Sequence, residues 1–266
     1  MASLDKKEES RPKFEITDGA LLPTQGNNYL INAWKLTIII AFGSLALLLF
    51  IVKEPYDKIF TVVIKGAPLT FSVTAGAILG SIFLGLFTGL GQIARTRIIN
   101  LIAGVYVELI RGIPLLVQLI FIYFALGKFF KLDGLPAAII ALSICYGAYM
   151  GEIFRAGIQS IPKGQMEAAL ALGMTRSQAM RYIILPQTMK IILPAIGNEF
   201  IAMLKDSSLV SVIALRDILR RGREHVSRTF LSLETYAIVA LVYLIITLVL
   251  SKLVAIMEDR MKQDVK

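Results

Sequence analysis

The sequence has few of the residues on which most catalytic and metal-binding sites depend. Its 266 residues include one cysteine, Cys145, and one histidine, His225. One cysteine cannot form an internal disulfide, and one histidine cannot build a multi-histidine metal site. The chain also lacks a G-x-x-x-x-G-K phosphate loop and a G-x-S-x-G nucleophile elbow, the usual carriers of nucleotide hydrolysis and acyl transfer. We therefore expect no enzymatic activity, no metal and no cofactor in this chain.

Charged residues are also scarce, at 18% of the chain, where soluble domains have roughly 25%. Apolar residues make up 56%, and the mean hydropathy is +0.70. These apolar residues gather in runs near or above the length of about 17 residues that a helix needs to cross a bilayer. The sequence therefore predicts an all-α, polytopic bundle of transmembrane helices.

The runs predict about six spans, so both ends of the chain lie on one side of the membrane. They cover residues 36–52, 67–93, 99–126, 136–154, 190–212 and 236–256. The polar residues before the first run predict a tail outside the membrane. The first run is followed by Glu54 and Pro55 rather than by a small-residue cleavage site, so we interpret it as a retained span and not as a signal peptide.

Several polar residues interrupt the third and fifth runs. A charge at the centre of a bilayer costs about 2.5–3.5 kcal/mol on insertion scales, so these helices should face protein or a watery cavity. The candidates for a substrate path are Glu108, Arg111, Gln118, Asn198, Glu199, Lys205 and Asp206. Glu108 and Arg111 are three residues apart, which allows either a mutual ion pair or a contact with substrate. Glu152 and Arg155 have the same spacing near a span end, where an ion pair is the favoured interpretation.

Lysine and arginine counts favour an orientation with both termini in the cytoplasm, with 16 basic residues inside and 10 outside. The segment between the fifth and sixth spans disagrees, because its arginines lie outside in this topology (Arg216, Arg220, Arg221, Arg223 and Arg228). Either the topology is wrong there, or a short external helix contacts a soluble partner. The net charge of +9 is attributed to loops and lipid headgroups, not to nucleic acid, because no basic stretch alternates with stacking aromatics.

Residues 160–186 predict a helical hairpin at the membrane surface. Ser160 is expected to cap its first helix, and Gly173 to end that helix in the left-handed conformation. Thr175 and Gln178 form a T-x-x-Q capping box for the second helix, which Pro186 is expected to break.

The same segment resembles the EAA loop in the membrane subunits of bacterial ABC importers. The match covers Glu167, Ala168, Ala169, Gly173, Ile183, Leu185 and Pro186. From about residue 66 to the end, the chain is similar to the polar amino acid permeases, which import histidine, glutamine, glutamate or arginine. The matching stretches are 108–118, 147–155 and 198–209. Residues 66–266 would form a core of five spans with the type I ABC importer permease fold. Residues 1–65 add a polar cytoplasmic tail and an extra first span.

The resemblance implies a permease in the bacterial cytoplasmic membrane that translocates polar amino acids. It implies four partners besides lipid: a dimeric ATPase that binds ATP and Mg²⁺, a second permease (identical or homologous), an extracytoplasmic binding protein, and the amino acid substrate. The loop would seat in the ATPase through Gln165, Glu167, Ala168, Ala169, Leu172 and Gly173. The alternatives are a channel or secondary carrier for a small polar solute, and a membrane scaffold without a transport path. The sequence does not choose between acidic, basic and amide substrates.

Overall fold

The computed structural model describes residues 33–263, and within this range the regular elements are helices. Residues 1–32 of the predicted polar tail lie outside the described range. The first half contains α1 (Ala33–Ala46), η1 (Leu47–Val52), α2 (Tyr56–Ile64), α3 (Ala67–Gln92), α4 (Arg97–Gly112), α5 (Leu115–Ile120), η2 (Phe121–Leu126) and α6 (Gly127–Phe130). The second half contains α7 (Gly134–Gln159), α8 (Lys163–Ala171), α9 (Arg176–Ala179), η3 (Met180–Ile184), α10 (Leu185–Asp206), η4 (Ser207–Ile213), α11 (Ile218–Thr229) and α12 (Ser232–Gln263).

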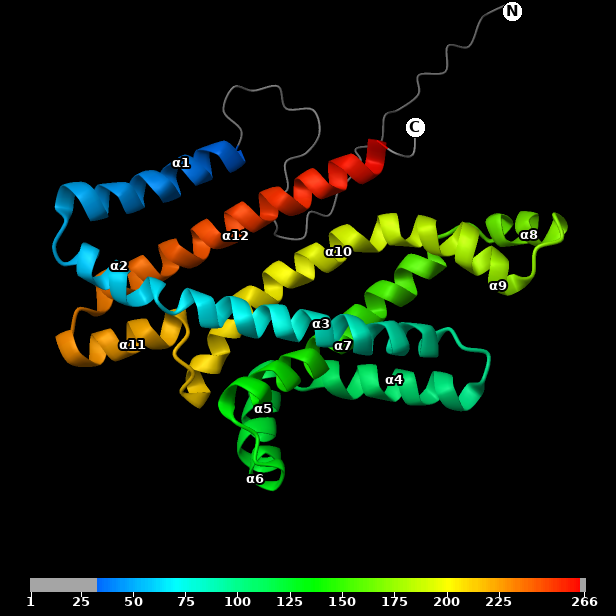
Figure 1. Ribbon diagram of the computed structural model, residues 1–266, viewed down its shortest axis with the longest axis horizontal. Coiled ribbons are helices and arrows are strands. Elements are labelled where there is room, and N and C mark those ends of the chain that lie inside the picture. Colours follow the sequence, from blue (N-terminus) through cyan, green and yellow to red (C-terminus); the bar gives the residue numbers. More distant parts are fainter. Residues whose placement is uncertain (1–32, 264–266) are drawn as a thin grey trace, which may run out of the picture.

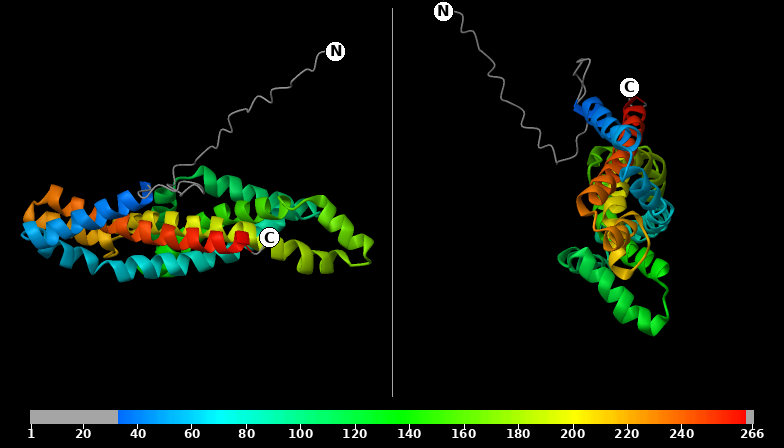
Figure 2. Two further views of the ribbon diagram at one scale, coloured as in Figure 1. Left: turned by 90° about the horizontal axis from the view of Figure 1, so that it is seen from above. Right: turned by 90° about the vertical axis from the view of Figure 1, so that its left-hand side faces the viewer.

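The helices form an elongated bundle whose long segments run back and forth along one axis (Figures 1 and 2). Four helical segments of the described chain are long and apolar enough to span a membrane: 33–52, 56–92, 134–159 and 232–261. A fifth candidate is the pair α4 and α5–α6, which is bent by 101°. The fifth predicted span, 190–212, corresponds mainly to α10, which crosses the bundle but carries Lys190, Glu199, Lys205 and Asp206. The prediction of about six spans is thus approximate.

Helices α3 and α7 share the most extensive contact in the bundle, because glycines let their backbones approach. A Cβ atom added to Gly85 would lie 2.3 Å from Met150 Cβ, and one added to Gly80 would lie 2.3 Å from Ser143 Oγ. A Cβ atom added to Gly89 would lie 2.7 Å from Phe154 Cβ. A row of small residues on α3 therefore forms the seam between these two helices.

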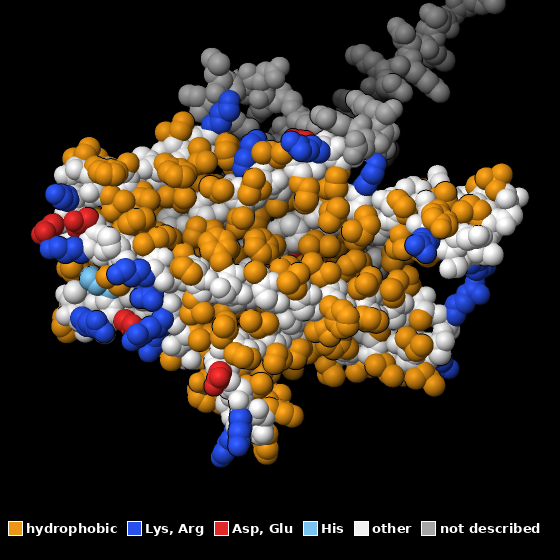
Figure 3. Space-filling view, in the orientation of Figure 1, with side chains coloured by type: hydrophobic (Ala, Val, Ile, Leu, Met, Phe, Trp, Pro, Cys, Tyr) orange, Lys and Arg blue, Asp and Glu red, His pale blue; other side chains and the backbone are white. Residues whose placement is uncertain are grey.

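Two apolar clusters hold the bundle together. The larger joins α3, α7 and α10 around residues such as Leu142, Met150 and Met203, which are buried. The smaller joins α2, α11 and α12 around Ile59 and Ile238 at the end of the molecule opposite α8 and α9. Figure 3 shows hydrophobic side chains over most of one face, while charged side chains gather near the two ends. This distribution matches a protein whose middle lies in lipid.

The chain bends sharply between α4 and α5, at residues 113–114. The break removes helical partners from carbonyl groups in a part of the chain predicted to lie in the membrane. The buried Gln118 side chain replaces them, since its Nε2 donates to the carbonyl oxygens of Ile110 at 2.7 Å and Ile113 at 2.8 Å. The bend is therefore fixed by one side chain, and α5–α6 projects from the bundle (Figure 1).

Candidate functional site

The hairpin predicted at residues 160–186 forms α8 and α9, at one extreme end of the bundle (Figure 1). Gly173 has a φ of 80°, the left-handed conformation predicted for the turn. The capping box is also confirmed: Gln178 N donates to Thr175 Oγ1 at 3.2 Å, and Thr175 N donates to Gln178 Oε1 at 2.8 Å. These bonds fix the start of α9 relative to α8.

Two local predictions for this hairpin are wrong. Ser160 does not cap α8; it is the C-cap residue of α7, and its hydroxyl donates to the carbonyl of Gly157. Pro186 does not break the second helix, because α9, η3 and α10 follow one another without interruption from residue 176 to residue 206. Pro186 lies in the first turn of α10, directly after the wider π-helical turns of η3, where its missing N–H is tolerated.

The hairpin presents most of its candidate coupling residues to the surroundings. One of the six, Ala169, is buried, whereas the exposed ones are Gln165, Glu167, Ala168, Leu172 and Gly173. Leu172 is 84% exposed, an unusual position for a large apolar side chain at the aqueous end of a bundle. A helix that shows small residues, one carboxylate and one exposed leucine offers a docking surface for a partner helix or groove.

A second feature is a cavity of about 440 Å³ between α4, α5, α7 and α10. Three of the seven substrate-path candidates line it: Arg111, Glu199 and Asp206. Tyr146 and Tyr149 line it as well, and sequence reasoning did not select them. The Tyr146 hydroxyl donates to Asp206 Oδ2 at 2.8 Å, and the Arg111 guanidinium lies 5.3 Å from the centre of the Tyr149 ring. The sequence signal that could have identified them is the spacing of Tyr146 and Tyr149, which lie one helical turn apart in a span otherwise rich in small residues.

The other four candidates do not line this cavity. Glu108 lies on an exposed face of α4, in a shallow hollow with Asn100 and Gly104. Gln118 holds the bend described above. Asn198 and Lys205 are exposed on α10.

Glu152 connects the cavity with the hairpin end of α7. Its Oε2 lies 3.7 Å from Arg111 Nη1 and 2.7 Å from Arg155 Nη2. The predicted Glu152–Arg155 ion pair is therefore present. The alternative that Arg111 pairs with Glu108 is not realised, because Arg111 turns toward α7 instead. One carboxylate thus joins a cavity arginine to an arginine one turn before the hairpin.

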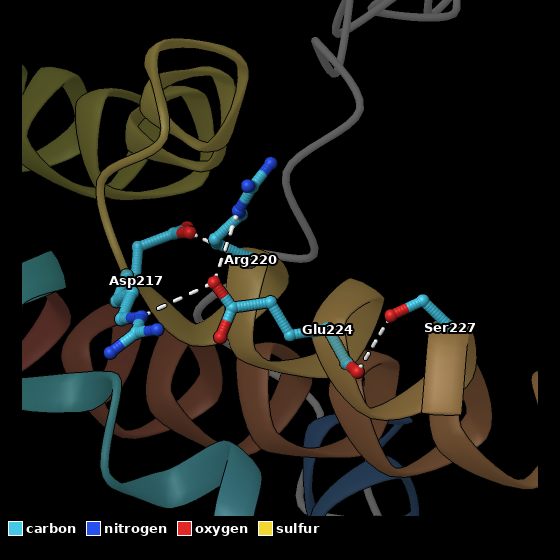
Figure 4. Close-up of polar contacts among 5 residues, drawn as sticks. Asp217, Arg220, Glu224 and Ser227 are labelled. Atoms are coloured by element: carbon cyan, nitrogen blue, oxygen red, sulfur yellow. Dashed lines mark hydrogen bonds and ion pairs between the residues drawn. The ribbon is translucent and has the colours of Figure 1, made fainter. Parts of the chain in front are cut away.

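The opposite end of the molecule carries a polar cluster on α11 (Figure 4). Asp217 caps this helix by accepting from Arg220 N at 2.8 Å and Leu219 N at 3.3 Å. Burial raises the pKa of Asp217 to about 6, although these amides and the Tyr243 hydroxyl act in the opposite direction. Arg216 Nε and Arg220 Nε both contact Glu224 Oε1, at 3.2 and 3.3 Å.

Long apolar helices, a polar cavity among them and a rigid exposed hairpin at one end define an integral membrane transport component. Residues 81–263 match the family described as "Binding-protein-dependent transport system inner membrane component", and the chain belongs to this family. It is the membrane component of such a system and not its ATPase; members work with an ATPase, a binding protein and a second permease.

Curated relatives agree with this membership. The chain is 42% identical over 202 residues to the glutamine transport system permease protein GlnP of Escherichia coli strain K12, covering 75% of this chain and 92% of that protein. It is 37% identical over 204 residues to the arginine transport system permease protein ArtQ of Bacillus subtilis strain 168, with coverage of 76% and 93%.

Solved structures show the same fold. A chain of an amino acid ABC transporter crystallised with histidines superposes with a TM-score of 0.73 at 44% identity, covering 77% of this chain and 96% of that one. The inward-facing MetNI methionine ABC transporter, at 20% identity and a TM-score of 0.64, shares the fold. The type I importer permease fold expected from the sequence is thereby confirmed.

Proposed function

We propose that this chain imports polar amino acids across the cytoplasmic membrane, driven by ATP that a separate ATPase dimer binds with Mg²⁺. The observation that carries the proposal is the hairpin α8–α9, which is exposed, rigidly capped and continuous with a helix that reaches the polar cavity. The names of the relatives, which include glutamine and arginine transport permeases, support amino acids as the substrate class.

In this proposal the hairpin end faces the cytoplasm and α11 faces outward. The basic-residue count supports this orientation, as does the direction of α12, which runs toward the hairpin end (Figure 1). Both termini are then cytoplasmic, and the arginines of α11 belong to an external helix. Residues 1–65, which comprise the polar tail and the extra first span, are an addition to the five-span core of residues 66–266.

The cavity between α4 and α10 is the proposed substrate contact. An amino acid carries a carboxylate and an ammonium group, and each needs an opposite charge inside the membrane. Arg111 supplies the cation, while Glu199 and Asp206 supply carboxylates from the facing helix. The volume of about 440 Å³ accommodates a polar amino acid with water.

Coupling is tested by reversing the charge of Glu167, which is exposed on α8. Glu167→Lys should leave the protein inserted and folded but abolish amino acid uptake that depends on ATP. Asp133→Lys, an exposed charge reversal at the start of α7, is the matched control and should transport normally. Normal uptake by Glu167→Lys would exclude the hairpin as the ATPase contact.

The substrate contact is tested at Arg111 in the same assay. Arg111→Leu should raise the KM for uptake by at least tenfold, because the substrate carboxylate loses a charge-assisted bond worth about 1.5–3 kcal/mol. Arg97→Leu, on the same helix but outside the cavity, should have no effect. Unchanged uptake by Arg111→Leu with normal expression would remove Arg111 from the site.

The alternative of a channel or secondary carrier makes the opposite prediction for energy supply. Solute flux that persists in ATP-depleted vesicles without a binding protein would favour it. A channel or secondary carrier would have no evident use for the exposed, capped helix pair α8–α9.

A further inference from the structure

The cluster on α11 encloses a basic pocket that the transport path does not use. We define the basic pocket as the cavity of about 250 Å³ lined by Lys65, Arg216, Arg221, Glu224, His225 and Arg228. Four cations face one carboxylate, so three positive charges remain unbalanced when His225 is neutral. Figure 3 shows Lys and Arg side chains gathered around a histidine at the end of the molecule that carries α11.

The carboxylate of the basic pocket is already engaged. Glu224 lies between the guanidinium groups of Arg216 and Arg220 (Figure 4). Burial acts to raise the pKa of Glu224, but the two arginines outweigh it and lower the pKa, so Glu224 stays ionised. Among residues 33–263, Arg221 and Arg228 form no ion pair, and the buried Nε of Arg221 has no acceptor. The positive charges of Arg221 and Arg228 are therefore not compensated by Glu224, and they favour an anionic ligand.

A lipid phosphate is the weaker candidate for this anion. A helix that lies on a membrane needs a free apolar face as well as a basic one. The apolar face of α11 is occupied, because Ile218 and Leu219 pack against α2 and α12. Gly222 is equally close to its neighbour, since an added Cβ would lie 2.8 Å from Val239.

The surroundings of the basic pocket fit a protein partner better. Phe230, the C-cap residue of α11, and Leu233, in the first turn of α12, are 86% and 81% exposed. Exposed aromatic and aliphatic side chains beside arginines are the composition of energetically important protein contacts. Arginine also binds carboxylates with two parallel hydrogen bonds, which sets orientation as well as strength.

We propose that the basic pocket receives surface carboxylates of the extracytoplasmic binding protein and orients that protein over the transport path. This inference rests on the proposed function, which places α11 outside. Unbalanced charge at an exposed end raises association rates with an acidic partner and makes them depend on salt.

The test uses the permease–ATPase complex in phosphatidylcholine nanodiscs, and the probe is the binding protein that stimulates ATP hydrolysis by the wild type. Arg228→Glu, an exposed position, should raise the binding-protein concentration for half-maximal stimulation about tenfold. It should also flatten the dependence on salt, with basal and maximal hydrolysis unchanged. Arg221→Gln should act in the same direction. Arg223→Glu is the matched control, because Arg223 is exposed on α11 but outside the basic pocket.

Equal half-maximal concentrations for the wild type, Arg228→Glu and Arg221→Gln would overturn the proposal. A defect that arises only in nanodiscs containing phosphatidylglycerol would overturn it in favour of a lipid phosphate. Failure of the proposed function has a different signature, because no amino acid and binding protein would then stimulate ATP hydrolysis by the wild type.

Discussion

The glycine seam between α3 and α7 predicts that one added methyl group separates α3 from α7, a helix that lines the cavity. In Gly85→Ala the new Cβ would lie 2.3 Å from Met150 Cβ and 2.9 Å from the Met150 carbonyl carbon. The second contact is with backbone, so a side-chain rotation cannot relieve it. Helix α7 must move by about 1 Å to restore ordinary contact distances, which lie near 3.5–4.0 Å.

A matched control separates the overpacking cost of Gly85→Ala from the gain in helix propensity that any glycine-to-alanine change brings. Gly43→Ala on α1 adds the same methyl group where nothing lies within 4 Å, and it gains up to about 1 kcal/mol of helix propensity. Gly85→Ala gains the same propensity but adds overpacking of about 1–3 kcal/mol. The difference between the two variants should therefore be about 1–3 kcal/mol, or roughly 2–12 °C in melting temperature for a chain of this size.

Thermal unfolding of both variants in the same detergent measures this difference. Because α7 also carries Tyr146 and Glu152, Gly85→Ala should reduce amino acid uptake relative to the wild type by a larger factor than it reduces the expression level. Equal melting temperatures for the two variants would refute the reasoning, since they would show that the seam accommodates a methyl group without moving backbone.

Four further perturbations have defined outcomes. Because the pKa of Asp217 is raised to about 6, its contribution to stability is fully present below about pH 4 and is lost as pH rises through 6. Asp217→Asn should remove up to about 3 kcal/mol of this pH dependence from thermal melts between pH 4 and 7. Identical pH profiles for the variant and the wild type would contradict this prediction. Thr175→Ala loses the capping box and about 1 kcal/mol of local stability, so more ATP should be hydrolysed per amino acid imported; an unchanged ratio would be evidence against coupling through α9. Tyr146→Phe removes the bond to Asp206 and should change the KM for uptake about tenfold, whereas a change in kcat alone would place this pair outside the substrate contact. Gln118→Leu removes the side-chain donor from the Ile113 carbonyl and leaves the Ile110 carbonyl with only the long bond of 3.5 Å from Ile113 N, so it should cost about 1–3 kcal/mol in a thermal melt. A melt like that of the wild type would mean that the bend needs no cap.

The helices and the hairpin were predictable because their signals are local. Apolar runs of sufficient length predict spans, and the Thr175–Gln178 pair with Gly173 predicts the bend of the hairpin. Its ends were less predictable: Ser160 has the chemistry of an N-cap, yet it closes the preceding helix α7 as its C-cap residue. Pro186 was misread because a π-helical turn upstream changes what a proline costs.

The cavity was predictable in part. Arg111, Glu199 and Asp206 were identified because charge is costly inside a membrane, but this argument selects every polar residue in a span. Gln118 and Lys205 satisfy it equally and serve elsewhere or face outward. Which side chains meet depends on the rotation and bending of the helices, and the 101° bend is a tertiary property that no spacing in the sequence contains.

The fixed bend after α4 converts a small tilt into a larger displacement. Because Gln118 ties α5 to the end of α4, the two segments move as one rigid body, and the angle between them stays fixed. The arm from Leu115 to Phe130 is about 24 Å long at 1.5 Å per residue. A tilt of α4 by about 5° therefore sweeps the tip of the arm through about 2 Å, which is more than the radius of a water molecule, about 1.4 Å.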